Sequence, residues 1–251
     1  MTKIKKMVSA KKVMAVMVLG LISGALLGAQ QAMTLTPELE SQVAAQLGSK
    51  QVIILIAMLQ TAALASLATI AGVWASPKVH LNKPFAWSRT SIAAAVSIGL
   101  LSASFIAIAE KLVFAESLGL AERFEFSWLY FLGSVLYGGI IEELLLRFGL
   151  MSIIIWLASK LTKTTDRNGI YIAGMVMAAL IFAAGHLPAT AQMLGLSTVT
   201  VIRTLLLNFL PGIGFGYLYW KHGLAYAMLG HIATHVINQL VLLPILFNVM
   251  N

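Results

Sequence analysis

Three ionisable residues stand close together in a stretch of sequence that is otherwise apolar. Glu142, Glu143 and Arg147 share one predicted helix, where a charge at the bilayer centre costs ~2.5–3.5 kcal/mol and normally faces a bundle interior or an aqueous cavity. At about 100° per residue, Glu143 and Arg147 lie about 40° apart, a spacing that favours an ion pair, whereas Glu142 lies about 140° from Arg147. We therefore interpret Glu143 and Arg147 as a structural pair and Glu142 as the free carboxylate. The alternative is a single buried charge cluster without chemistry.

Three histidines lie within or at the ends of other apolar segments. His186 follows Phe182 by four residues on the same predicted helix face, and Gly185 beside it leaves room for another backbone or a substrate. His231 and His235 are also four residues apart, the spacing with which two imidazoles share one small target, as in helical metal sites.

Each of these histidines has a less specific alternative. His186 is compatible with an ordinary core residue, and His231, His235 and Asn238 on the same stripe are compatible with interhelical hydrogen bonds. The connections nevertheless favour convergence, because Glu142 begins a helix that ends in the 160–168 turn and His186 ends the helix that returns from it. A carboxylate and three imidazoles below the membrane surface can activate water and stabilise an oxyanion.

The composition places these residues in a membrane protein. The chain has 251 residues, of which 59% are hydrophobic and 10% charged, against about 25% charged in an ordinary soluble domain. This excludes a soluble globular enzyme, a nucleic-acid-binding domain and a disordered tail. The absence of cysteine excludes disulfides, thiolate zinc sites and cysteine nucleophiles.

The net charge of +8 reflects membrane topology rather than nucleic-acid binding. Five of the positive charges precede the first apolar segment, at Lys3, Lys5, Lys6, Lys11 and Lys12. Lysines in this place favour a cytoplasmic N-terminus, so we expect a multi-pass protein of the cell membrane that begins inside. We interpret the first apolar segment as an uncleaved helix, because no clear small-x-small cleavage site follows it.

The apolar segments predict an all-α polytopic membrane helix bundle with seven to eight transmembrane helices. A membrane-spanning helix needs about 20 apolar residues, and the candidate segments are 13–29, 52–75, 91–109, 127–161, 170–189, 199–220 and 224–247. We expect 34–50 to be an external connection, and 1–126 and 127–246 to form the N-terminal helices and a C-terminal core within one bundle.

The segment 127–161 is too long for one straight crossing, about 52 Å at 1.5 Å per residue. Gly138 and Gly139 are the expected break, between a short helix up to Tyr137 and a second helix from about Ile140 to Lys160. The basic loop 160–168 favours the inside, which conflicts with a full crossing by 127–137. The orientation after residue 126 therefore stays open at this point.

Two further features lie on the segment 199–220. Gly212 and Gly216 form a small-xxx-small pattern, which predicts close helix contact. Arg203 is expected to extend toward the membrane surface or to line the cavity.

Three motifs in order resemble the CPBP (Abi) family of intramembrane proteases, which includes the type II CAAX prenyl endopeptidases. They are EExxxR at Glu142–Arg147, FxxxH at Phe182–His186, and a final helical motif that begins at His231. The similarity covers about residues 127–245.

The resemblance implies an intramembrane endopeptidase with a water-filled cavity and a peptide or membrane-protein substrate in the lipid bilayer. Glu142 would be the general base, assisted by His186, and His231 with the residue four later would stabilise the tetrahedral oxyanion. Glu143 and Arg147 match the remaining motif positions.

One position departs from the family pattern, because His235 replaces the usual asparagine or aspartate. Histidine can still donate a hydrogen bond to an oxyanion, so the role can survive. It can equally bind zinc, and Glu142, His186, His231 and His235 would then be a ligand set. Two cofactor hypotheses follow, one with none required and one with a zinc-like divalent metal.

Other classes of function stay open at this stage. One is a non-catalytic bacteriocin-immunity or scaffold membrane protein, as some members of the family are. Another is an ion or proton transporter, which would also place carboxylates and histidines in the membrane but usually contains structural repeats. The sequence shows no such repeat.

Overall fold

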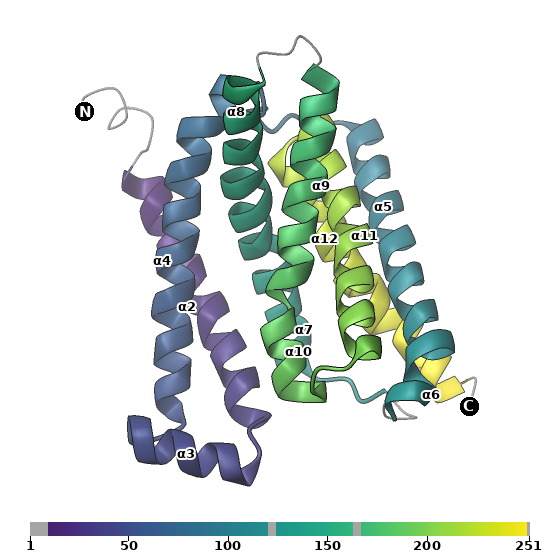
Figure 1. The fold of residues 1–251 in the computed structure, drawn as a ribbon. Coiled ribbons are helices and arrows are strands. Elements are labelled where there is room, and N and C mark those ends of the chain that lie inside the picture. The colour runs from purple at the N-terminus through teal and green to yellow at the C-terminus, as the bar shows by residue number, and fades with distance from the viewer. Residues whose placement is uncertain (1–9, 120–123, 163–166, 250–251) are drawn as a thin grey trace.

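The computed structural model describes residues 10–119, 124–162 and 167–249, and in this part of the chain it contains helices and no strand. Figure 1 shows the helices side by side in a single bundle. The first half consists of α2 (Ala10–Met33), α3 (Pro37–Leu47), α4 (Gln51–Ala75), η1 (Ser76–Val79), α5 (Arg89–Ala109), η2 (Glu110–Phe114) and α6 (Ala115–Leu118). The second half consists of α7 (Trp128–Gly133), η3 (Ser134–Met151), α8 (Ser152–Leu161), α9 (Arg167–Gly185), α10 (Leu187–Leu194), α11 (Thr198–His222), α12 (Leu224–Ile237), η4 (Asn238–Leu242) and η5 (Ile245–Val249).

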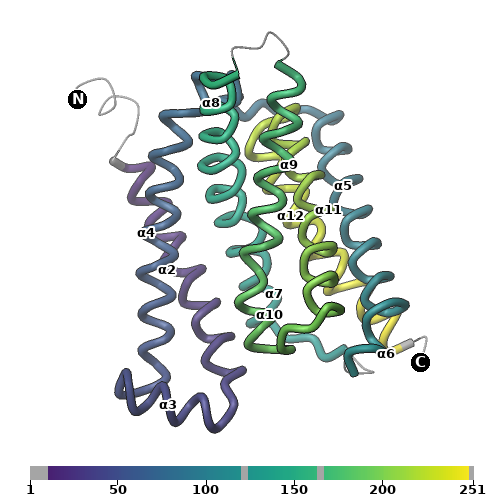
Figure 2. Tube along the Cα trace, in the orientation of Figure 1, coloured from purple at the N-terminus to yellow at the C-terminus, as the bar shows by residue number. Residues whose placement is uncertain are grey.

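α2 and α4 form a close antiparallel pair along one flank of the bundle (Figures 1 and 2). A Cβ atom at Gly24 would lie 2.5 Å from the carbonyl oxygen of Ala57, so only glycine permits this approach. The expected connection between the two helices contains a helix of its own, α3. Thr36 caps it by accepting a hydrogen bond from the Leu39 N–H (3.3 Å), and Pro37 occupies its first position, where a missing N–H costs nothing.

The expected break at Gly138 and Gly139 is wrong, because α7, η3 and α8 form one continuous helical run from Trp128 to Leu161. Its central part is a π-helix, with backbone hydrogen bonds of the i→i+5 type. A Cβ atom at Gly138 would lie 2.5 Å from Nε2 of His235, and one at Gly139 would overlap Ile232. The two glycines therefore let α12 pack directly against η3 rather than end a helix.

The small residues of α11 have the predicted role. Cβ atoms at Gly212 and Gly216 would meet Ala179 at 3.2 Å and Met175 at 2.6 Å, so these glycines let α11 approach α9 closely. Arg203 lies on the same helix, and its guanidinium forms an ion pair with Glu110 through two hydrogen bonds, one of them 3.0 Å from Nε to Oε2.

Six helices of the described chain are long and apolar enough to cross a membrane. They are Lys11–Met33, Gln51–Val79, Arg89–Leu118, Arg167–Leu194, Thr198–His222 and Leu224–Asn248. The protein is therefore a multi-pass membrane protein, and six, rather than the expected seven to eight, is the number that length and composition establish. The continuous run Trp128–Leu161 contains Glu142, Glu143 and Arg147 and is not among the six.

The two ends of the bundle differ in charge. α2, α5 and α9 begin at one end, where α4, α8 and α11 stop (Figure 1). In the described segments, the charged residues of this end are all basic: Lys11, Lys12, Lys78, Lys83, Arg89, Lys160, Arg167 and Lys221. The opposite end, formed by α3, η2, α6 and the segment before α7, holds Glu38, Glu40, Glu110, Glu116 and Glu125 beside Lys50, Lys111 and Arg203. Of the residues in the topology argument, Lys3, Lys5 and Lys6 and positions 163–166 of the basic loop lie outside the described residues.

Candidate active site

Glu143 and Arg147 form the ion pair that their spacing predicts. Arg147 Nη1 donates to Glu143 Oε1 at 2.9 Å, and Arg147 Nη2 donates to the carbonyl oxygen of Gly212 at 2.9 Å. Both side chains are fully buried, and the guanidinium carbon lies 5.0 Å from the ring centroid of Phe182. The pair therefore ties η3 to α11 and α9. The contact of Arg147 with the Gly212 carbonyl was not predicted from the sequence, because a backbone oxygen is present at every residue.

His231 is attached to the same buried carboxylate. Its Nδ1 lies 2.9 Å from Glu143 Oε1, and its ring stacks on Phe215 with centroids 4.3 Å apart. Because Glu143 is paired with Arg147, its carboxylate accepts and His231 Nδ1 donates. In a neutral imidazole the other nitrogen, Nε2, is then the acceptor.

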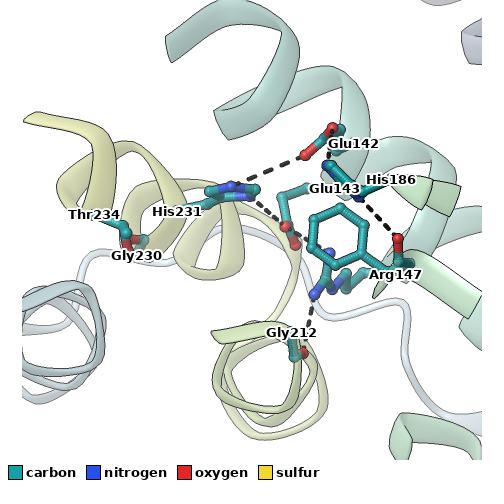
Figure 3. A network of polar contacts seen from close by, with 9 residues as sticks. Glu142, Glu143, Arg147, His186, Gly212, Gly230, His231 and Thr234 are labelled. Atoms are coloured by element: carbon teal, nitrogen blue, oxygen red, sulfur yellow. Dashed lines mark hydrogen bonds and ion pairs between the residues drawn. The ribbon is translucent and has the colours of Figure 1, made fainter. Parts of the chain in front are cut away.

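Glu142 points away from this cluster and faces two imidazoles, as Figure 3 shows. Its Oε1 lies 3.8 Å from His186 Nε2, and its Oε2 lies 4.0 Å from His231 Nε2. These separations are longer than a hydrogen bond, and a water molecule can bridge polar groups at such distances. The glutamate that the helical angles left without a partner is thus the one that faces both histidines.

His186 lies at the corner between α9 and α10, where Pro188 follows. Its Nδ1 lies 2.9 Å from the carbonyl oxygen of Phe182. A carbonyl can only accept, so Nδ1 carries the proton and Nε2 of the neutral ring directs its lone pair toward Glu142. The backbone of α9 therefore fixes the tautomer of His186.

His235 lies one turn beyond His231, with the two rings stacked 4.9 Å apart. Its Nε2 is buried and has no hydrogen-bond partner. An orphaned buried polar atom costs about 1–3 kcal/mol, and this nitrogen packs against Gly138 of η3.

These groups line a cavity of about 750 Å³. Glu142, His186, His231 and His235 contribute to its wall, while Glu143 and Arg147 lie behind it. Other polar residues of the wall, which the motifs did not identify, are Gln30, Gln31, Gln60, Ser134, Tyr137, Gln192, Asn208 and Thr234. In the sequence, these positions could have been recognised as polar residues within apolar helices. The cavity has the volume of a ligand pocket. Apolar residues form most of its wall around the single carboxylate of Glu142.

The zinc hypothesis requires three or more donors that converge on one point. In the described residues, no group of three histidine or acidic side chains is placed to hold a metal ion. His235 faces Gly138 and stacks on His231, and it does not join Glu142 and His186. In this arrangement the four residues of the hypothetical zinc ligand set do not converge on one point.

The fold and the cavity together define a class of protein: a membrane-embedded helical bundle with an acid–base site below its surface. Residues 124–237, which include all six motif residues, match the family model described as Rce1-like, type II CAAX prenyl endopeptidase Rce1-like. This match supports the resemblance of the segment to the CPBP (Abi) family, whose members include intramembrane proteases of the CAAX type. No curated protein and no solved structure matches the chain.

Replacing Gly138 by alanine tests the contact between η3 and His235. The new methyl group would overlap His235 Nε2, and such overpacking costs typically 1–3 kcal/mol. We expect Gly138→Ala to lower the thermal unfolding temperature in detergent and to reduce turnover. Gly185→Ala is the matched control for stability, because a Cβ atom there meets nothing within 4 Å. Equal unfolding temperatures in the two variants would contradict the contact.

Proposed function

We propose that the protein is an endopeptidase that hydrolyses a peptide bond within the membrane with a water molecule activated by Glu142 and His186. The observation that supports this most directly is the position of the Glu142 carboxylate, which faces Nε2 of His186 and Nε2 of His231 at the wall of a large cavity. In this mechanism the water lies between these groups, and Glu142 takes its proton as the oxygen attacks the scissile carbonyl. When the tetrahedral intermediate collapses, the C–N bond breaks and the leaving amine takes up this proton. His186, held by Phe182, accepts a hydrogen bond from the same water and orients it.

His231 and His235 stabilise the oxyanion in this mechanism. His231 Nε2 becomes a donor to the oxyanion when it takes over the proton that Glu142 removed from the water, until the leaving amine takes up that proton. The Glu143 carboxylate on Nδ1 stabilises the resulting cation. This arrangement resembles a carboxylate that supports a catalytic histidine in a triad. The orphaned Nε2 of His235 gains a partner if it carries the proton and donates it to the oxyanion.

The proposal requires no metal, and removal of divalent ions tests this. We expect the purified protein to keep its turnover after dialysis against a strong chelator and to contain well under one metal ion per chain by elemental analysis. A decrease in turnover by orders of magnitude on chelation, as in a metalloprotease, that zinc reverses would instead establish a metal site.

The experiment that tests the activity is a search for new peptide N-termini. The purified protein in nanodiscs is incubated with a solubilised membrane proteome, beside the Glu142→Gln variant. We expect cleavage products that appear only with the parent protein and that map to apolar segments, since the substrate must reach a cavity inside the bundle. No difference between the two incubations would contradict the proposal and favour a non-catalytic immunity or scaffold role.

We further propose that the run Trp128–Leu161 crosses the cell membrane once, as a seventh spanning helix, and that the basic end faces the cytoplasm. The positive-inside rule supports this orientation, and a single continuous crossing removes the conflict over the basic loop 160–168. The two exposed residues Ser41 on α3 and Thr162 after α8 lie at opposite ends. Because the chain has no cysteine, we expect Ser41→Cys to react with a membrane-impermeant maleimide in intact cells and Thr162→Cys to react only after lysis. The reverse pattern would overturn the orientation.

A further inference from the structure

A second, smaller cavity lies at the basic end of the bundle. Its volume is about 170 Å³, and it shares no lining residue with the active-site cavity. The lining residues come from η1 and its following residue, α8 and α9: Lys78, Val79, His80, Ile155, Ser159, Arg167, Ile170 and Tyr171. We call it the basic pocket.

The charges of the basic pocket are all of one sign. Lys78, His80 and Arg167 line it, no acidic residue of the described segments does, and Lys160 lies close enough to Lys78 for their charges to interact. In the described segments, the ion pairs involve none of these four residues. A concave site lined by positive charge concentrates anions.

The wall of the basic pocket is held in place by specific contacts. The Tyr171 hydroxyl donates to the carbonyl oxygen of Val79 at 2.6 Å, and its ring stacks on Trp220 with centroids 5.2 Å apart. His80 adopts the left-handed conformation (φ 56°), which no other non-glycine residue of the described segments adopts. Such backbone strain occurs at ligand clamps, and here it sets where the imidazole leaves the turn.

Aromatic residues place the basic pocket at the level of the lipid headgroups. Trp74 and Trp156 pack edge to face with centroids 4.6 Å apart, and Lys78 Nζ lies 3.0 Å from the centroid of Trp74. Tryptophan and tyrosine gather at the membrane–water interface, and Trp220 and Tyr171 lie at the same end of the bundle. Basic pockets between helices at this level bind anionic lipid headgroups.

We propose that the basic pocket binds the phosphate group of an anionic phospholipid, with Lys78, Arg167 and the imidazole N–H of His80 as its donors. The same chemistry would accept a free phosphate ion, and the interfacial level of the pocket favours the lipid. Binding there joins η1, α8 and α9, and it is independent of the peptidase activity.

The test measures lipid binding to the full-length protein in neutral detergent by native mass spectrometry. Phosphatidylglycerol is compared with phosphatidylcholine, and the variant Lys78→Gln/Arg167→Gln is compared with Arg89→Gln/Lys221→Gln. The second variant is the matched control, because it removes two positive charges at the same end, one of them stacked on a tryptophan, outside the pocket. Each basic residue near a lipid headgroup contributes roughly 1 kcal/mol. We therefore expect the first variant to bind phosphatidylglycerol at least ~10-fold more weakly than the parent, and the control to bind as the parent does.

Inorganic phosphate and glycerol phosphate distinguish the two sources of the phosphate group. If neither compound displaces phosphatidylglycerol at millimolar concentration, the result supports the lipid. Displacement by inorganic phosphate supports the free ion. Equal binding of phosphatidylcholine, or equal losses in the two double variants, would overturn the proposal. Unfolding temperatures of both variants without lipid show whether they are folded, and single Lys78→Gln and Arg167→Gln variants replace the double one if it is not.

Discussion

Glu142→Gln is expected to abolish peptide hydrolysis while leaving the protein folded and inserted. The amide keeps the shape of the side chain but cannot take a proton from water, and positioned acid–base groups contribute typically 10²–10⁴-fold to the rate. The structure adds a reason for normal folding, because Glu142 makes no direct hydrogen bond, while its neighbour Glu143 makes two. Turnover is measured as the yield of new peptide N-termini, and folding as the unfolding temperature and size-exclusion profile.

The control for this variant is Glu116→Gln, which removes an acidic residue of α6 at the acidic end of the bundle. We expect it to keep the turnover of the parent. If Glu142→Gln retained more than a tenth of the parent rate, Glu142 would not be the general base.

Glu143→Ala is expected to have the largest effect on stability. It leaves the Arg147 guanidinium buried with only the Gly212 carbonyl as an acceptor, and it removes the partner of His231 Nδ1. Removal of one member of a buried ion pair costs about 3–5 kcal/mol. We expect a large decrease in the unfolding temperature in detergent, or loss of the folded protein from the membrane.

Glu40→Ala provides the matched comparison. Glu40 forms an ion pair of the same length with Lys50 (2.9 Å), but both side chains are exposed, and exposed pairs contribute about 0–1 kcal/mol. Unfolding of Glu143→Ala at the temperature of Glu40→Ala would refute the structural role of the buried pair.

The sequence predicted the contacts that depend on spacing along one helix. Glu143 and Arg147 are neighbours on almost any helical backbone, so their pairing was predicted even though η3 is a π-helix. For the same reason Glu142 was expected to face elsewhere. His231 and His235 also lie on one face as expected, with stacked rings.

Contacts that depend on how two helices pack against each other could not be predicted. The Gly212 carbonyl and the Phe215 ring meet the site only because α11 lies at a particular height beside η3 and α12. The wrong break at Gly138 and Gly139 has the same origin. In isolation two glycines weaken a helix, whereas here the space they leave is filled by His235 and Ile232.

The buried Arg147 joins the helices of one half of the cavity wall through charged groups, and the other half is held by uncharged contacts. Through the guanidinium and Glu143, the helices η3, α9, α11 and α12 are cross-linked at a single depth, so they cannot separate there without exposing a charge. On the opposite side the wall consists of Leu27 and the glutamines of α2 and α4, and no ion pair joins that helix pair to the core in the described chain. There the hydrogen bond from Gln30 Nε2 to the carbonyl oxygen of Leu129 (3.0 Å) and the close packing of Gly149 against Ala68 hold α2 and α4 to the core. Separation of the helices on this side would therefore expose no buried charge, in contrast to the side that Arg147 joins.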